Sequence, residues 1–218
     1  MSGERTVVHL MRHGQVENPH GVLYGRLPGY HLSELGRRMA LQAAESFRGL
    51  DLVHLRCSPL ERAQETIAPV VEIVDLPVIT DGRVIEADNY LEGRTFSAKN
   101  SALKDPRTWR YLRNPLKPSW GEPYRQIVAR MRAAIADARE AAAGHEALIV
   151  SHQLPIWMAR CDAEGRRLAH DPRRRECTLA SVTSLTFQGS RLTAVSYREP
   201  VADLLPGKER STKFVAGA

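Results

Sequence analysis

An apolar, β-branched run that stops abruptly at polar residues limits the possible folds of this chain more than any other feature. The run begins at Thr6 and ends at Met11, and it reads as a short buried strand followed at once by Arg12, His13 and Gly14. Ligands of open α/β sheets bind just beyond the carboxyl ends of the strands. Arginine offers a planar fork of donors suited to phosphate, and histidine is a nucleophile or proton carrier near neutral pH. The run therefore predicts a strand that delivers Arg12 and His13 to a binding site.

A second apolar run, at residues 52–57, is followed by Ser58 and Pro59. Ser58 is expected to be the N-cap, and Pro59 the first residue, of a helix that extends to about residue 74. This helix carries Arg62 in its first turn, beside free backbone N–H groups at its positive end. An ion pair with a neighbouring glutamate does not explain a cation in that place, whereas a bound anion does.

Two more strand predictions end in a histidine and in an acid. Residues 147–150 form an apolar run that delivers His152 to a loop, and residues 84–86 read as an extended piece that ends in Glu86. Because parallel strands end at one edge of a sheet, these side chains are expected beside those of the two preceding motifs. Two histidines and two arginines would make a pocket for a tetrahedral dianion, and an acid at its rim could handle protons.

The alternation of strands and helices predicts an α/β fold with three layers, α/β/α, around a mainly parallel central sheet. Ser33 is the expected N-cap of the first helix. The other expected elements are a strand at 77–80, helices at 34–48, 124–143 and 155–160, and a hairpin of strands at 179–187 and 192–197.

The length of 218 residues fits a single domain over 1–218. A segment at about 88–122 loses regularity and is expected to be an insertion, either folded over the site like a lid or a surface excursion with its own apolar cluster. Residues from about 201 to 218 are expected to form a loose tail. The two C-terminal strands can pair within a subunit or across the edge of a homodimer, and the sequence leaves both open.

Composition and charge limit the kinds of molecule that are expected to bind this protein. The net charge of +6 suits a small anionic molecule. The basic run Arg173–Arg175 lacks interleaved aromatic residues and is expected to be a solvated loop, so neither nucleic acid nor a membrane is expected as a partner. No apolar run approaches the roughly 20 residues of a membrane span, and three cysteines without metal-ligand spacing suggest reduced thiols. A cytoplasmic location is expected.

Three motifs together resemble the histidine phosphatase superfamily, the phosphoglycerate mutase-like family. They are Arg12-His13-Gly14, Ser58-Pro59-Leu60-Glu61-Arg62-Ala63-Gln64-Glu65-Thr66 and Val150-Ser151-His152. The resemblance spans about residues 6–197, and the joint match is specific for the superfamily but not for a substrate. It implies a phosphoglycerate mutase-like fold and an enzyme that acts on phosphate esters.

The resemblance also implies a role for each site residue. His13 would attack phosphorus and become a phosphohistidine, while its other ring nitrogen donates to a backbone carbonyl, expected to be that of Gly14. Glu86 would protonate the leaving oxygen and then accept a proton from water. The three non-bridging oxygens would be held by Arg12, Arg62 and His152. Neither a metal ion nor another cofactor is expected, because the protein supplies the cations.

The sequence departs from the family pattern in three places. Asn18 lies one residue closer to His13 than is common. The segment after Glu86 is slightly short, which leaves Asp88 and Glu92 as rival proton donors, although Glu92 is expected to be structural. Gln153 replaces the usual glycine after the second histidine, and its side chain either reaches the mouth of the pocket or faces outward.

Further substrate contacts are predicted from residues near the motifs: Asn18, Tyr24, Gly25, Arg26 and Gln153. Together with Tyr24 and Arg26, cations of the insertion could bind a second anionic group of the substrate: Lys104, Arg107, Arg110 and Arg113. These residues favour a sugar phosphate or phosphoacid over an aromatic ester.

Three functions compete. A metal-independent phosphatase that hydrolyses a small phosphorylated metabolite is favoured. A cofactor-dependent phosphoglycerate mutase is the first alternative, but the chain is short for that branch, and Gln64-Glu65-Thr66 stands where basic residues would be expected after Arg62. A non-catalytic anion-binding member is the second alternative, and the intact set of motif residues argues against it.

Overall fold

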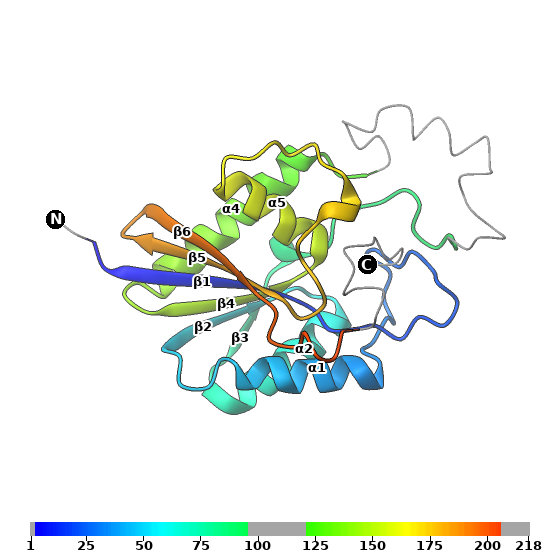
Figure 1. The fold of residues 1–218 in the computed structure, drawn as a ribbon, viewed down its shortest axis with the longest axis horizontal. Coiled ribbons are helices and arrows are strands. Elements are labelled where there is room, and N and C mark those ends of the chain that lie inside the picture. Colours follow the sequence, from blue (N-terminus) through cyan, green and yellow to red (C-terminus); the bar gives the residue numbers. More distant parts are fainter. Residues whose placement is uncertain (1–2, 96–120, 206–218) are drawn as a thin grey trace.

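A computed structural model describes residues 3–95 and 121–205. This part of the chain is built around a six-stranded sheet (Figure 1). The strands are β1 (Arg5–Arg12), β2 (Leu52–Cys57), β3 (Val78–Thr80), β4 (Glu146–Ser151), β5 (Val182–Gln188) and β6 (Arg191–Arg198). Their order is β3-β2-β4-β1-β5-β6. The pairs from β3 to β1 are parallel, and β5 and β6 join as an antiparallel hairpin.

Helices cover both faces of the sheet. Figure 1 shows α4 (Tyr124–Ala141) and α5 (Gln153–Ala163) on one face and α1 (Glu34–Glu45) and α2 (Glu61–Val74) on the other. Short 3₁₀ turns occur at Gly82–Val84 and Pro172–Arg174. The three layers and the mainly parallel sheet confirm the predicted fold class.

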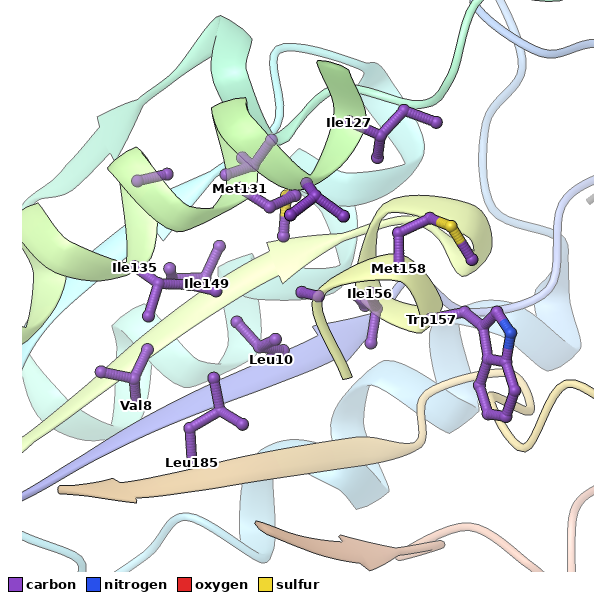
Figure 2. Close-up of a cluster of buried hydrophobic side chains, with 14 of the residues drawn as sticks. Val8, Leu10, Ile127, Met131, Ile135, Ile149, Ile156, Trp157, Met158 and Leu185 are labelled. Carbon is purple, nitrogen blue, oxygen red and sulfur yellow. The ribbon is translucent and has the colours of Figure 1, made fainter. Parts of the chain in front are cut away.

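The side chains of β1 alternate between two apolar cores, because successive residues of a strand point to opposite faces of the sheet. Val8 and Leu10 pack under α4 and α5, whereas Met11 packs under α1 and α2. Figure 2 shows the first core, in which Ile156 of α5 and Ile149 of β4 approach Leu10. Burial on both faces explains why this strand reads as a continuous apolar run.

The parallel strands end at one edge of the sheet in register. Arg12 is level with Ser151, and Cys57 is level with Val150. Backbone pairing continues beyond the strands, since the N–H group of His13 donates to the carbonyl of Ser151 over 3.1 Å. The loops that leave β1, β2 and β4 therefore begin side by side, and this places their first polar residues together.

Three predictions about local structure were wrong. Ser58 does not cap α2, whose N-cap is Leu60 with no side-chain hydrogen bond, because the Ser58 hydroxyl bonds to His152 instead. Glu86 does not end a strand: a 3₁₀ turn precedes it, because the carboxylate of Asp81 accepts from the N–H group of Arg83 and closes the turn. Helix α5 begins at Gln153 rather than at Pro155.

The C-terminal segment is not loose at its start. Val201 and Leu205 are buried in the core beneath α1 and α2, so the apolar contacts that fix this part of the chain extend at least to residue 205. Residues 206–218 lie outside the described part of the chain. The cysteines at 57, 161 and 177 are free thiols, and all of them are buried.

The predicted insertion is described only at its two ends, where Asn89 and Gly121 pair as an isolated β-bridge. Residues 96–120 lie outside the described residues, and with them the predicted contacts of Lys104, Arg107, Arg110 and Arg113. Among residues 3–95 and 121–205, no helix has the length and apolar character that crossing a membrane requires.

Candidate active site

His13 is the first residue after β1, and it is buried. Its Nδ1 lies 2.8 Å from the carbonyl oxygen of Gly14, so Nδ1 carries the proton and Nε2 keeps its lone pair. Burial, together with the guanidinium groups of Arg62 and Arg12, lowers the pKa of His13 well below its ordinary value. The imidazole is therefore neutral near pH 7, as a nucleophile must be.

Arg12 and Arg62 are also buried, and each uses one nitrogen on a backbone carbonyl. Arg12 donates to Cys177 over 2.7 Å, and Arg62 donates to Gly25 over 2.6 Å. Within the described part of the chain, Nε and Nη2 of Arg12 and Nε and Nη1 of Arg62 have no hydrogen-bond partner. Unpaired donors are costly to bury, so these four nitrogens indicate a place for an anion.

His152 completes the group from the end of β4. Its ring centroid lies 5.1 Å from that of His13. Its Nε2 lies 2.7 Å from the hydroxyl of Ser58, whereas its buried Nδ1 has no partner among the described residues. Ser58 can donate its hydroxyl proton to Nε2, and this bond favours the tautomer in which Nδ1 carries the proton and can serve as a donor.

Glu86 is the buried acid of the site, whereas its rivals are more open: Asp88 is exposed and Glu92 is half-buried. Burial raises the pKa of Glu86, and the nearby charge of Arg62 opposes this only in part. One carboxylate oxygen accepts from the N–H group of Ala87 over 2.8 Å. A carboxyl group with a raised pKa can serve as a general acid.

Two arginines hold the segment that carries Glu86. Arg26 donates to the backbone carbonyl of Glu86 over 2.7 Å and pairs with Glu122 at 2.9 Å. Arg130 of α4 pairs with the same Glu122 and donates to the carbonyl of Ile85 over 2.7 Å. Arg26, predicted to contact the substrate, is thus bound within the protein, and it fixes the position of the acid.

The other residues predicted to contact the substrate differ in whether they touch the residues of the site. Asn18 bonds twice to the backbone of Val22 and closes its own loop. The ring of Tyr24 lies 4.8 Å from the guanidinium carbon of Arg62, and Gly25 is the residue whose carbonyl receives Arg62. The Gln153 side chain is half-buried; it donates to the carbonyl of Cys177 and accepts from Arg175.

Sequence reasoning missed Arg175 and Ser58. Arg173 and Arg174 are exposed, as expected of a solvated loop, but Arg175 turns inward and donates to the side chains of His170 and Gln153. No spacing or composition signal separates Arg175 from its two neighbours. Ser58 stands where a helix cap is common, and only the tertiary fold brings it to His152.

The site therefore combines a neutral imidazole, an acid with a raised pKa and several buried donors without partners among the described residues, near enough to act on one another. Such donors can stabilise the charge that develops when a phosphoryl group is transferred. In the described ranges 3–95 and 121–205, no group of three or more His, Cys, Asp or Glu side chains is placed to hold a metal ion.

Comparison with known proteins identifies the family of the chain. Residues 8–200 match the model of the histidine phosphatase superfamily, branch 1. The uncharacterized protein Rv0525 of Mycobacterium tuberculosis is 53% identical over 199 residues, which cover 91% of this chain and 98% of that protein. A probable phosphoglycerate mutase of Klebsiella pneumoniae is 31% identical over 155 residues, which cover 68% of this chain and 70% of the mutase.

Solved structures share the fold. The mycobacterial glucosyl-3-phosphoglycerate phosphatase Rv2419c superposes with a TM-score of 0.71 at 25% identity, over 89% of this chain and 97% of the phosphatase. Structures of phosphoglycerate mutase-fold proteins superpose similarly, so the fold is phosphoglycerate mutase-like, as the sequence predicts. The chain belongs to the histidine phosphatase superfamily, branch 1.

Proposed function

We propose that this protein is a metal-independent phosphatase that hydrolyses a small phosphomonoester through a phosphohistidine on His13. The single observation that carries the proposal is the neutral Nε2 of His13 beside five buried nitrogens that have no partner in the described part of the chain. They belong to Arg12, Arg62 and His152. A phosphoryl group beside Nε2 would satisfy these donors, and its charge would balance the two guanidinium groups.

In the first step, Nε2 of His13 attacks phosphorus, and the bond from phosphorus to the ester oxygen breaks. Glu86 gives its proton to the departing oxygen, so the product leaves as a neutral alcohol. The raised pKa of Glu86 keeps that proton available at pH values where an exposed glutamate has lost it. Arg12 and Arg62 compensate the charge on the phosphoryl oxygens during transfer.

In the second step, water attacks the phosphohistidine. Glu86, now ionised, accepts a proton from the water, and the bond from phosphorus to Nε2 breaks. Inorganic phosphate leaves, and His13 and Glu86 return to their first states. Two steps with good geometry replace one slow hydrolysis, which is the general advantage of a covalent intermediate.

Mutase activity is the second candidate, since a relative at 31% identity is a probable phosphoglycerate mutase. One observation supports hydrolysis instead. Glu65 of α2 stands three residues after Arg62, where the mutase branch would be expected to carry basic residues. Its carboxylate accepts from the N–H group of Leu32 over 2.9 Å.

The test is release of phosphate from p-nitrophenyl phosphate in the presence of EDTA, with wild type and His13→Ala side by side. Wild type is expected to turn over, and His13→Ala is expected to lose nearly all activity, a loss of about a millionfold at most for a nucleophile. His145→Ala is the matched control. His145 is exposed, and it precedes β4 at the far end of that strand from His152.

Brief incubation with radioactive phosphoester should label wild type at a site that is stable to base and labile to acid, as a phosphohistidine is. Turnover that persists in His13→Ala, or a label on another residue, would contradict the proposal. Conversion of 3-phosphoglycerate to 2-phosphoglycerate without phosphate release would favour the mutase.

A further inference from the structure

Arg175 lies next to the site but is not one of the residues around His13. Its Nε donates to Nε2 of His170 over 2.8 Å, and its Nη1 donates to the side-chain oxygen of Gln153 over 3.3 Å. Tyr124 of α4 is near enough to act electrostatically on Arg175. The guanidinium is thus held by side chains from α5 and from its own loop, with Tyr124 close by.

Both hydrogen-bond partners of Arg175, His170 and Gln153, are neutral. Nδ1 of His170 donates to the carbonyl of Leu168 over 2.6 Å, so its Nε2 is an acceptor. Burial lowers the pKa of His170. Among residues 3–95 and 121–205, no carboxylate forms an ion pair with Arg175. Its position is fixed, but its charge is not neutralised, in contrast to Arg130, which pairs with Glu122.

Gln153 connects Arg175 to the phosphoryl-binding group. Its side-chain nitrogen donates over 3.4 Å to the carbonyl of Cys177, and the same carbonyl accepts from Arg12 over 2.7 Å. Arg175 therefore lies one side chain away from Arg12. The charges of Glu86 and Arg12 are near enough to act on it, and part of its surface stays exposed.

We propose that Arg175 binds a second anionic group of the substrate, a carboxylate or a second phosphate, while the residues around His13 hold the phosphoryl group. This inference rests on the proposed function and names its substrate class, phosphomonoesters that carry another negative charge. Arginine suits this role because its planar fork binds carboxylate and phosphate through two parallel hydrogen bonds. Gln153 is a positioning residue, since it sets the guanidinium at a fixed place relative to Arg12.

The test compares two substrates that differ in one group: 3-phosphoglycerate, which carries a carboxylate, and glycerol 3-phosphate, which carries a hydroxymethyl group. The readout is the ratio of their kcat/KM values. In Arg175→Gln, the ratio is expected to fall by about ten- to a hundredfold, mainly because the substrate with the carboxylate binds more weakly and its KM rises. Arg174→Gln is the matched control, because it removes the same charge from an exposed position in the same loop and should keep the wild-type ratio.

Gln153→Glu is the second variant, since Arg175→Gln could fail to fold. A carboxylate at position 153 would pair with Arg175 and compete with the substrate, so the ratio should fall again. Equal losses for both substrates would overturn the inference, because they would show an effect on the site as a whole. An unchanged ratio would overturn it as well.

Binding separates this inference from the proposed function. Calorimetry with His13→Ala, which cannot turn over, should show 3-phosphoglycerate or propane-1,3-diol bisphosphate bound at least tenfold tighter than glycerol 3-phosphate. The tighter of the two identifies the second group as a carboxylate or a phosphate, and the advantage should vanish when Arg175→Gln is added. Equal affinity for all three compounds would overturn the inference, even if wild type proves to be a phosphatase. Selective binding without turnover by wild type would instead contradict only the proposed function.

Discussion

At the scale of single residues, the site concentrates buried positive charge. Arg12 and Arg62 are almost fully buried, and within residues 3–95 and 121–205 neither has a carboxylate at ion-pair distance. Burial lowers the pKa of Arg62, which reflects the cost of keeping this cation out of water. The free protein thus holds an arrangement that becomes favourable only when an anion occupies it, which is typical of a preorganised binding site.

The two titrating groups of the proposed mechanism predict the pH profile of kcat/KM for an alkyl phosphate. His13 must be neutral and Glu86 protonated. Because the pKa of His13 is lowered, kcat/KM should fall on the acid side only below pH 6.5. Because the pKa of Glu86 is raised, kcat/KM should fall on the basic side at a higher pH than the pKa of an ordinary glutamate would give. In Glu86→Gln, activity should fall by about 10²- to 10⁴-fold, and the Glu86-dependent limb should disappear.

Asp88→Asn is the control, since Asp88 is the exposed rival acid two residues away. Its profile should match that of wild type, and the comparison between variants cancels the ionisation of the substrate itself. A wild-type profile in Glu86→Gln, or loss of the limb in Asp88→Asn, would mean that the proton donor is misassigned.

The bond from Ser58 favours one tautomer of His152, and its removal should therefore affect turnover more than stability. Ser58→Ala leaves Nε2 of His152 without its donor, so the proton can move from Nδ1, where the phosphoryl group needs it. We expect kcat to fall about tenfold, as one hydrogen bond in the transition state is worth roughly 1–1.5 kcal/mol. Steady-state kinetics of the variant measure this loss.

Ser46→Ala is the matched control for Ser58→Ala. The Ser46 hydroxyl donates to Ala43 over 2.6 Å at the end of α1, so the variant loses one hydrogen bond away from the site. Both variants should unfold at similar denaturant concentrations, and only Ser58→Ala should turn over slowly. Equal kcat values would remove Ser58 from the mechanism.

Residue types and strand ends are enough to place part of the site from sequence. Arg12 ends β1, and His13 and His152 directly follow β1 and β4, so their positions depend on local structure that the apolar runs reveal. The inward turn of Arg175 and the bond from Ser58 to His152 depend on segments that meet only after folding. No local pattern encodes such contacts.

At the scale of elements, the N-terminal end of α1 packs against the loop that carries His13. A Cβ atom added to Gly14 would lie 2.7 Å from the carbonyl oxygen of Gly36, and one added to Gly36 would overlap the carbonyl oxygen of Gln15. The Ser33 hydroxyl caps α1 through Gly36 and also donates to the side chain of Gln15. The helix thus sets the path of the loop that carries His13 through direct contact between backbones.

Gly36→Ala tests this contact between α1 and the loop. Alanine would ordinarily stabilise a helix by about 1 kcal/mol relative to glycine. Here the overlap with Gln15 should reverse the sign, with a loss of about 1–3 kcal/mol from overpacking. A displaced loop also misplaces His13, so kcat should fall by up to about a hundredfold. Denaturant unfolding and steady-state kinetics measure the two effects.

Gly82→Ala provides the comparison. No atom lies within 4 Å of a Cβ atom added at Gly82, so its stability should stay within about 0.5 kcal/mol of wild type. A stable and fully active Gly36→Ala would show that the loop does not depend on this approach.

The sequence predicts the bounds of an element closely where apolar residues form a continuous run or alternate with polar ones. It does not predict elements that depend on a side-chain hydrogen bond. The predicted strand at 52–57 agrees with β2 (Leu52–Cys57), and the Ser33 cap of α1 is present. The 3₁₀ turn before Glu86 forms because the Asp81 carboxylate accepts from the backbone of Arg83. In the segment before Glu86, an extended strand and a 3₁₀ turn would show similar apolar patterns, so the sequence alone does not distinguish them.

At the scale of the whole molecule, the layers follow from the sequence but the strand order does not. Alternating strands and helices imply a sheet with helices on both faces. The order β3-β2-β4-β1-β5-β6 places β4 between β1 and β2, although many residues separate them along the chain. This crossing brings His152 between the motifs of β1 and β2, and it depends on long-range packing rather than on any local pattern.

The excess of buried positive charge also predicts how the whole molecule responds to anions. A ligand that binds only the folded state stabilises it by about 2.7 kcal/mol at a hundred times its Kd. For a protein of this size, inorganic phosphate at that concentration should raise Tm by roughly 5–10 °C. Sodium chloride at equal ionic strength should not, because a monovalent ion cannot satisfy donors from several side chains at once.

Arg62→Met separates this specific effect from a general effect of salt. The variant removes the free Nε and Nη1 donors, so most of the response of Tm to phosphate should be lost. Without phosphate its Tm should change little, because the loss of the bond to Gly25 is offset by the removal of a buried charge. Arg167→Met, at an exposed position, should keep the full wild-type response. If both variants responded equally, phosphate would be binding elsewhere, and the anion site at the ends of β1, β2 and β4 would be wrong.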